Sequence, residues 1–414
     1  LNISIIFKRN VRVRSRIATL DFARGLAIFG ILLLNIIAFG LSKAAYLNPA
    51  FAGTPSASDT WTWAVLDALA QGKFLMMFAM LFGGGLFLLL PRGKHWIQAR
   101  LSILLLCGFL HATLMWDGDI LLSYGLIGLV CWRMVREGRS SQSLISTGII
   151  LYLIGVAVLA MLGFITSPKP GSFWLPGPAE IQYEQYWRLK GGWEAIRNRL
   201  DLLSSSLLAI GAQYGWELAG AMLIGSGLMR SGWLKGAFRV SHYRKVAAVL
   251  LPLSLLIQIP AIYLQYRTGW DYRWSGFLLQ VPREIGSLMQ AVSYLALCYG
   301  FWPLISRWRI THWISQTGRM ALTSTTGLEV SNTALRNHAV SSNVSVPWVI
   351  TTPVTKGSDN TSWQRSANVR HSSHSMYLLS ICAICSHTRA RPCSALSSPG
   401  TPCNKSATPT SAAL

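Results

Sequence analysis

Long apolar runs separated by short polar loops dominate the chain as far as residue 305. A helix that crosses a membrane needs about 20 predominantly apolar residues. Segments of roughly this kind occur at 22–41, 71–90, 100–116, 119–134, 144–165, 204–228, 246–264 and 285–305. The third and fourth are short, and Asp117 and Gly118 alone separate them, which predicts a tight helical hairpin. The pattern therefore predicts an all-α, polytopic transmembrane helix bundle with about eight spans.

The distribution of Lys and Arg predicts how this bundle is oriented. Basic residues gather in the N-terminal segment 1–21 and in the loops that follow the even-numbered spans, whereas the odd-numbered loops hold most of the acids. Lys and Arg favour cytoplasmic loops, so we expect a cytoplasmic N-terminus in a multi-pass protein of the bacterial inner membrane. The outer loop 166–203 then contains an amphipathic stretch, 181–203, which we expect to lie along the outer surface.

Composition supports a lipid bilayer as the partner of this chain. Hydrophobic residues make up 51% of it and charged residues only 13%, whereas a soluble protein is about one-quarter charged. The net charge of +22 does not indicate nucleic-acid binding, because the basic residues lie in short loops between apolar runs instead of on one polar domain.

The segment 324–414 differs from everything before it. It is rich in Ser and Thr, has neither helical nor strand periodicity, and contains no apolar run of membrane-spanning length. Cys382, Cys385 and His387 have a spacing that can ligate zinc, but no surrounding pattern would build a metal domain. We therefore expect no metal site in this segment. We expect spans six to eight to lie within 204–323, and the segment 324–414 to be a disordered or frame-shifted tail.

The first span carries polar residues on one stripe. Asp21 and Arg24 are three residues apart and are therefore neighbours on a helix. Asn35 follows Arg24 by eleven residues, which brings it back to within about 20° of the same face, about 16 Å further along. The stripe is explained either by an interfacial anchor with an interhelical hydrogen bond or by a function that uses the buried ion pair.

A second polar group surrounds the predicted hairpin. His111 lies in the outer half of the third span, and Asp119 opens the fourth, where a carboxylate also suits the positive end of a helix. Histidine is suited to proton transfer near neutral pH, and an acid can orient it. The alternative is a histidine hydrogen-bonded within the bundle and an aspartate that caps a helix.

Further candidates lie in the second and sixth spans. Glu217 falls near the middle of its span, and a carboxylate there is a candidate functional group. Lys73 begins the second span and either binds a ligand or extends to the membrane surface. Gly83, Gly84 and Gly85, and the stripe of Gly211, Gly215 and Ala219, predict close helix packing.

These motifs resemble the YeiB-like family of bacterial inner-membrane proteins, which has a domain of unknown function. The resemblance covers about 14–323 and rests on the pattern Leu-Asp-x-x-Arg-Gly at 20–25, Asn35, Gly-Lys-Phe at 72–74, the His111 to Gly125 segment and Gly-Arg-Met-Ala-Leu-Thr at 318–323. In the family the last motif leads into further transmembrane helices, which implies about two more spans in the natural protein.

The first span also resembles two groups of membrane acyltransferases. In the group that acylates cell-surface sugars, a catalytic histidine stands where this chain has Asn35. The lysosomal glucosaminide acetyltransferase type is similar to this chain in having Asn there, and its catalytic histidine lies in the following loop. Because 42–70 contains no histidine, His111 would be an independent replacement.

The leading hypothesis is an acyltransferase-like protein without a permanently bound cofactor. Arg24 would hold an acidic donor such as an acyl-coenzyme A from the cytoplasmic side, and His111, oriented by Asp119, would act as general base for a small periplasmic acceptor. The alternatives are a small-solute transporter with a proton relay through Glu217, Asp119 and His111, and a non-catalytic scaffold. The candidates for binding substrate or donor are Asp21, Arg24, Asn35, Lys73 and Glu217.

Overall fold

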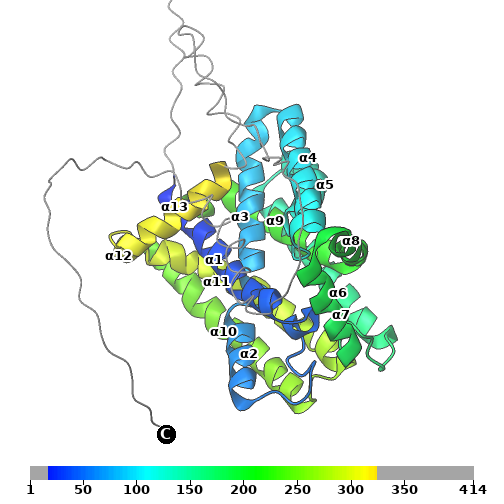
Figure 1. The fold of residues 1–414 in the computed structure, drawn as a ribbon. Coiled ribbons are helices and arrows are strands. Elements are labelled where there is room, and N and C mark those ends of the chain that lie inside the picture. Colours follow the sequence, from blue (N-terminus) through cyan, green and yellow to red (C-terminus); the bar gives the residue numbers. More distant parts are fainter. Residues whose placement is uncertain (1–16, 324–414) are drawn as a thin grey trace, which may run out of the picture. The chain divides into compact units, whose positions relative to one another are not determined.

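The computed structural model describes residues 17–323, which form helices joined by loops (Figure 1). No strand occurs between these limits, so the all-α prediction is confirmed. The helices are α1 (Ala18–Gly40), α2 (Ala57–Leu69), α3 (Lys73–Leu89), α4 (Lys94–Leu110), α5 (Leu121–Glu137), α6 (Ser141–Ile165), α7 (Pro178–Lys190), α8 (Gly192–Ala209), α9 (Gly215–Arg230), α10 (Val240–Arg267), α11 (Gln280–Gly300), α12 (Trp302–Ile305) and α13 (Arg309–Thr323). The predicted tail 324–414, including Cys382, lies outside the described residues.

Six helical segments are long and apolar enough to cross a membrane: Ala18–Gly40, Ala57–Arg92, Lys94–Met115, Ser141–Ile165, Gly192–Arg230 and Val240–Arg267. The chain is therefore a polytopic helical membrane protein. The other two predicted spans are present as helices α5 and α11. Helix α5 has only 17 residues, and α11 carries Arg283 and Glu284 near its start, so neither meets the same standard of length and apolarity.

Helices α3 and α9 pack backbone against backbone at the centre of the bundle. A Cβ atom on Gly83 would lie 1.9 Å from the carbonyl oxygen of Met222, and one on Gly225 would lie 1.8 Å from that of Met80. Small residues permit such close approach of membrane helices. The predicted packing role of Gly83 is confirmed, but that of Gly211 is wrong, because nothing lies within 4 Å of the Cβ it would carry.

The first and last described helices make a second contact of this kind. A Cβ atom on Gly25 of α1 would lie 1.9 Å from the carbonyl oxygen of Ile314, and one on Gly318 of α13 would lie 1.9 Å from that of Asp21. The motifs at 20–25 and 318–323 therefore meet in space, although they stand at opposite ends of the described chain. Their glycines are explained by helix packing.

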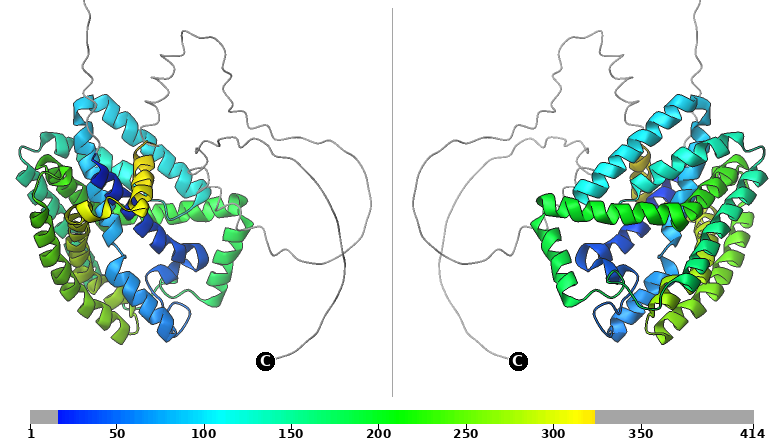
Figure 2. Two further views of the ribbon diagram at one scale, coloured as in Figure 1. Left: turned by 90° about the vertical axis from the view of Figure 1, so that its left-hand side faces the viewer. Right: turned by 90° about the vertical axis from the view of Figure 1, so that its right-hand side faces the viewer.

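The predicted amphipathic stretch 181–203 is divided between α7 and α8. Gly191 and Gly192 have φ values of +66° and +65°, a region that glycine adopts without the steric cost other residues meet, and the chain turns there. Helix α8 lies across the neighbouring helices (Figure 2). A π-helical turn, η4 (Ile210–Tyr214), then joins it to the buried helix α9, which accords with the tendency of π-bulges to bend helices.

Candidate functional site

His111 and Asp119 form a hydrogen-bonded pair, as their positions in the sequence predicted. His111 Nδ1 lies 2.9 Å from Asp119 Oδ1. The second carboxylate oxygen, Oδ2, accepts a hydrogen bond of 2.8 Å from the backbone N–H of Leu122 in the first turn of α5. One oxygen of Asp119 therefore caps helix α5 and the other holds the imidazole of His111.

The backbone of His111 is itself unusual. Helix α4 ends at Leu110, and His111–Met115 form a π-helical turn, η3. Such turns are rare and are found frequently at functional sites. The His111 side chain is 34% exposed and that of Asp119 only 2%, and no described residue forms a hydrogen bond with His111 Nε2. With Nδ1–H donated to Asp119, Nε2 carries the lone pair and is free to accept a proton.

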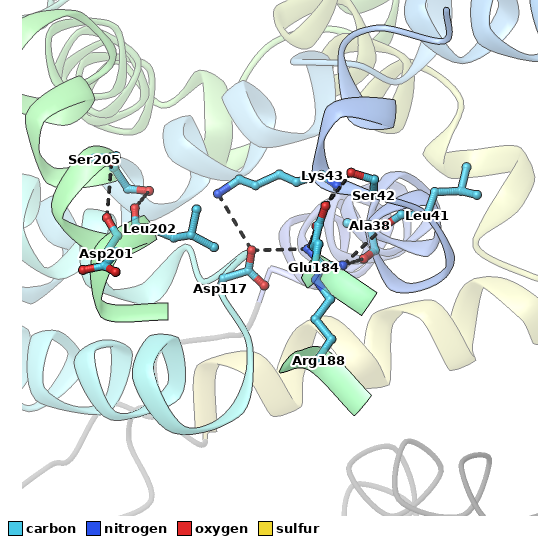
Figure 3. A network of polar contacts seen from close by, with 11 residues as sticks. Ala38, Leu41, Ser42, Lys43, Asp117, Glu184, Arg188, Asp201, Leu202 and Ser205 are labelled. Carbon is cyan, nitrogen blue, oxygen red and sulfur yellow. Dashed lines mark hydrogen bonds and ion pairs between the residues drawn. The ribbon is translucent and has the colours of Figure 1, made fainter. Parts of the chain in front are cut away.

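A network of ions and hydrogen bonds holds the hairpin turn next to this pair (Figure 3). Asp117 lies 3.8 Å from Lys43 Nζ and 3.7 Å from an Arg188 nitrogen. Arg188 also pairs with Glu184 at 2.7 Å, and Glu184 accepts a 2.5 Å hydrogen bond from the Ser42 hydroxyl. Helix α7 is thus tied both to the chain after α1 and to the turn that carries Asp119. This network could not be predicted from the sequence, because its members come from three segments far apart in the chain: 42–43, Asp117 and helix α7.

Asp21 and Arg24 are paired, as predicted, with 3.4 Å between the carboxylate and the guanidinium. Both residues are buried. The pair lies far from His111. Phe39, at the other end of α1, contacts Trp116, which lies beside His111. Arg24 and Phe39 are fifteen residues apart on this helix, which corresponds to about 22 Å. Asn35 is half-buried between these levels, and its side chain forms no hydrogen bond within residues 17–323.

Lys73 belongs to a second charged group inside the bundle. It is fully buried, and its Nζ donates a 2.5 Å hydrogen bond to the backbone carbonyl of Asp67. The alternative that Lys73 extends to the membrane surface is therefore wrong. The Asp67 carboxylate forms an ion pair with Arg283, and both side chains are buried. Asp67 lies on α2, a helix that the apolar pattern did not predict, and Arg283 lies just before the span predicted at 285–305, so neither was a predicted site residue.

Glu217 lies near this second group instead of near His111. Its carboxylate accepts a 2.6 Å hydrogen bond from the Gln213 amide and interacts electrostatically with Glu284. The Tyr152 hydroxyl donates to the Glu284 backbone oxygen at 2.9 Å and lies 3.3 Å from its carboxylate. The structure thus separates six of the seven predicted site residues into three places: the Asp21–Arg24 pair, the His111–Asp119 pair, and a buried group with Lys73 and Glu217. The seventh, Asn35, lies on α1 between the two pairs.

Comparison with known proteins gives relatives whose names state no activity. Residues 228–324 match the family described as "Protein of unknown function (DUF418)". The chain is 57% identical over 309 residues to "Uncharacterized protein YeiB" of Escherichia coli (strain K12), covering 75% of this chain and 80% of that protein. It is 35% identical over 151 residues to "Uncharacterized protein YxaH" of Bacillus subtilis (strain 168), covering 34% and 37% respectively. No solved structure matches the chain.

Proposed function

Since the chain belongs to the YeiB-like family of membrane proteins, whose activity its relatives' names leave open, we propose a function from its own side chains. The protein transfers an acyl group from a cytoplasmic thioester donor to a hydroxyl or amine on the outer side of the bacterial inner membrane. Its N-terminus faces the cytoplasm, as the positions of Lys and Arg favour. The observation that carries the proposal is the 2.9 Å contact between His111 Nδ1 and the buried carboxylate of Asp119.

In this reaction His111 acts as general base and Asp119 as the residue that positions it. Nε2 removes the proton from the acceptor hydroxyl while the acceptor oxygen bonds to the acyl carbon. The carbon–sulfur bond then breaks, and the imidazolium returns the proton to the departing thiolate. Asp119 keeps its charge throughout and stabilises the imidazolium, as the aspartate does in serine-protease triads.

The separation between Arg24 and His111 suits a long donor. An acyl-coenzyme A has its phosphates and its thioester at opposite ends of a flexible chain, so it can span levels about 22 Å apart. The proposal assigns Arg24 to the phosphates, with Asp21 holding the guanidinium when no donor is bound. Asn35 lies between the two levels and is assigned to the donor chain. No permanently bound cofactor is required.

The test is transfer of label from acetyl-coenzyme A. The purified full chain is incubated with the labelled thioester and a panel of hydroxyl and amine acceptors, and labelled product is measured. We expect turnover that His111→Gln abolishes and that His95→Gln leaves unchanged, because His95 is an exposed histidine at the start of α4. Absence of turnover above the His111→Gln level for every acceptor would overturn the proposal.

A specific observation also favours a second function, proton-coupled movement of a small solute. Glu217 is buried and Glu284 is half-buried, their carboxyl groups interact within the bundle, and Tyr152 and Gln213 hydrogen-bond to them. Carboxyl groups inside membrane proteins commonly form proton relays. In proteoliposomes, solute accumulation that follows an imposed pH gradient and is lost in Glu217→Gln would support transport, and the acyl-transfer proposal would fail if this occurred without any thioester turnover.

A further inference from the structure

We propose that a cavity between the end of α1, α2 and the start of α11 binds a neutral polyhydroxylated molecule of about monosaccharide size, recognised by Asp67 and Arg283. The cavity is separate from the His111–Asp119 pair. Leu34 and Ile37 of α1 line the cavity. Phe39 points to another side of α1, about 200° around the helix from Ile37, and contacts Trp116 beside His111. The proposal therefore does not depend on acyl transfer.

The cavity has the size and the lining of a ligand site. Its volume is about 430 Å³, and small-molecule sites commonly have about 300–1,000 Å³ with apolar walls and a few polar groups. Phe51, Trp63 and Leu66 supply apolar wall, and Trp63 is held by an edge-on contact of 5.2 Å with Trp270. Its polar lining includes Asp67 and Arg283, which are buried and define its buried end, and Tyr46 and Gln71, which are half-buried.

Two polar atoms at the buried end lack partners. Asp67 is 3% exposed and Arg283 is 5% exposed. Among the described residues, neither Asp67 Oδ2 nor Arg283 Nε has a hydrogen-bond partner, although both atoms are buried. Buried polar groups are normally satisfied, and leaving them unpaired is unfavourable. A bound ligand that accepts from Nε–H and donates to Oδ2 would satisfy both.

Neighbouring side chains on the far side from the cavity hold Asp67 and Arg283 in place. Arg283 forms an ion pair with Asp67 and donates a second hydrogen bond to Gln280, while Lys73 Nζ donates to the Asp67 backbone carbonyl. Such fixed side chains lose little freedom when a ligand binds. Tyr46 is half-buried, and its removal from water raises the pKa of its hydroxyl, which therefore stays protonated and able to donate.

The chemistry of the cavity selects a neutral ligand with hydroxyl groups. Asp67 and Arg283 already neutralise each other, and the remaining charged lining residue, Asp59, is a carboxylate, so an anionic ligand would lose its hydration without gaining an opposite charge. A hydroxyl group both donates and accepts, as the two unpaired atoms require. The apolar wall with Phe51 and Trp63 favours a molecule that also presents C–H surface, which a sugar ring or a cyclic polyol provides on its faces.

The test uses the purified full chain and neutral probes: methyl glucoside, methyl galactoside and myo-inositol, with glucose 6-phosphate and glucuronate as charged probes of similar size. Binding is measured by calorimetry and by saturation-transfer NMR. We expect at least one neutral probe to bind, and the charged probes to bind at least about tenfold more weakly. Binding of no neutral probe, or stronger binding of a charged one, would overturn the proposal.

Matched variants locate the binding. Asp67→Asn should weaken it about tenfold by removing a carboxylate acceptor. Because Asp67 also pairs with Arg283, Thr62→Trp provides a second variant: Thr62 is exposed and lines the cavity, so the indole fills the space without breaking the ion pair. Trp61→Ala is the control on the same helix, since Trp61 is 72% exposed. Unchanged binding in Thr62→Trp would overturn the location, and unchanged binding in His111→Ala would separate this site from acyl transfer.

Discussion

His111 and Asp119 differ in their access to solvent, and the difference matches the two tasks proposed for them. The histidine is 34% exposed and the aspartate 2%. A general base must reach its substrate, whereas a residue that only orients it gains from burial, because a hydrogen bond is stronger where water is excluded. If the histidine were buried and the aspartate exposed, the proposed base could not reach its substrate.

The first prediction separates orientation from folding. Asp119→Asn retains an oxygen that can accept from the Leu122 N–H, so the α5 cap is kept and the free energy of unfolding should change by less than about 1 kcal/mol. The imidazole, however, loses the carboxylate that fixes its tautomer, and acyl transfer should fall by about a hundredfold or more. Initial rates and urea unfolding in detergent measure the two effects. A variant that unfolds more easily and loses activity in proportion would instead indicate a structural role.

The second prediction concerns the buried ion pair. Arg283→Gln leaves the Asp67 carboxylate buried without its partner, and removing one member of such a pair costs about 3–5 kcal/mol. Adding Asp67→Asn removes the uncompensated charge, so the double variant should be more stable than Arg283→Gln alone. The coupling is measured by a double-mutant cycle of unfolding free energies. Simple addition of the two single effects would show that the pair contributes nothing through its charge.

Residues close in sequence could be paired from the sequence, and residues far apart could not. Asp21 with Arg24, and His111 with Asp119, were both predicted because helical spacing or a short hairpin limits where they can lie. Asp67 and Arg283 are 216 positions apart, and only the packing of α2 against the bundle brings them together. The burial of Lys73 was not predicted for a related reason, because its partner is the backbone carbonyl of Asp67 on α2, a helix that was not predicted.

At the scale of whole helices, hydrophobic periodicity located the bundle but not its irregularities. Long apolar runs predicted α1, α3, α6 and α10 because burial in lipid requires them. The apolar pattern did not predict helix α2, because this helix has only 13 residues and these include two aspartates and two tryptophans. The π-helical turns at His111–Met115 and Ile210–Tyr214 arise from a change in backbone hydrogen bonding, which the spacing of apolar side chains does not record.

The third prediction tests the contact between α3 and α9. A Cβ atom on Gly225 would lie 1.8 Å from the Met80 carbonyl oxygen. This is a backbone atom that cannot move aside, so Gly225→Ala must separate the helices and should destabilise the protein by about 1–3 kcal/mol. Gly211→Ala is the matched control, because nothing lies within 4 Å of its added methyl group. Thermal unfolding in detergent compares the two. Equal stability of both variants would contradict the close contact.

For the whole molecule, the remaining prediction from the sequence is the orientation across the membrane. Helices α8 and α9 connect the α7 region to the loop after Arg230, and the predicted topology puts these two ends on opposite sides. Lys190 and Lys235 are both exposed, and they mark the two ends. A single pair of positions thus tests both the number of crossings between them and the direction of the chain.

Single cysteines at these positions, in a background without other cysteines, should react differently with a membrane-impermeant maleimide. Lys190→Cys should be labelled in intact spheroplasts, because the loop that contains it is predicted to face outwards. Lys235→Cys should be labelled only after permeabilisation. The reverse pattern would invert the whole chain, and with it the side from which the donor reaches Arg24. Labelling of both from the outside would mean that α8 and α9 do not cross the membrane between them, although Gly192–Arg230 is long and apolar enough to do so.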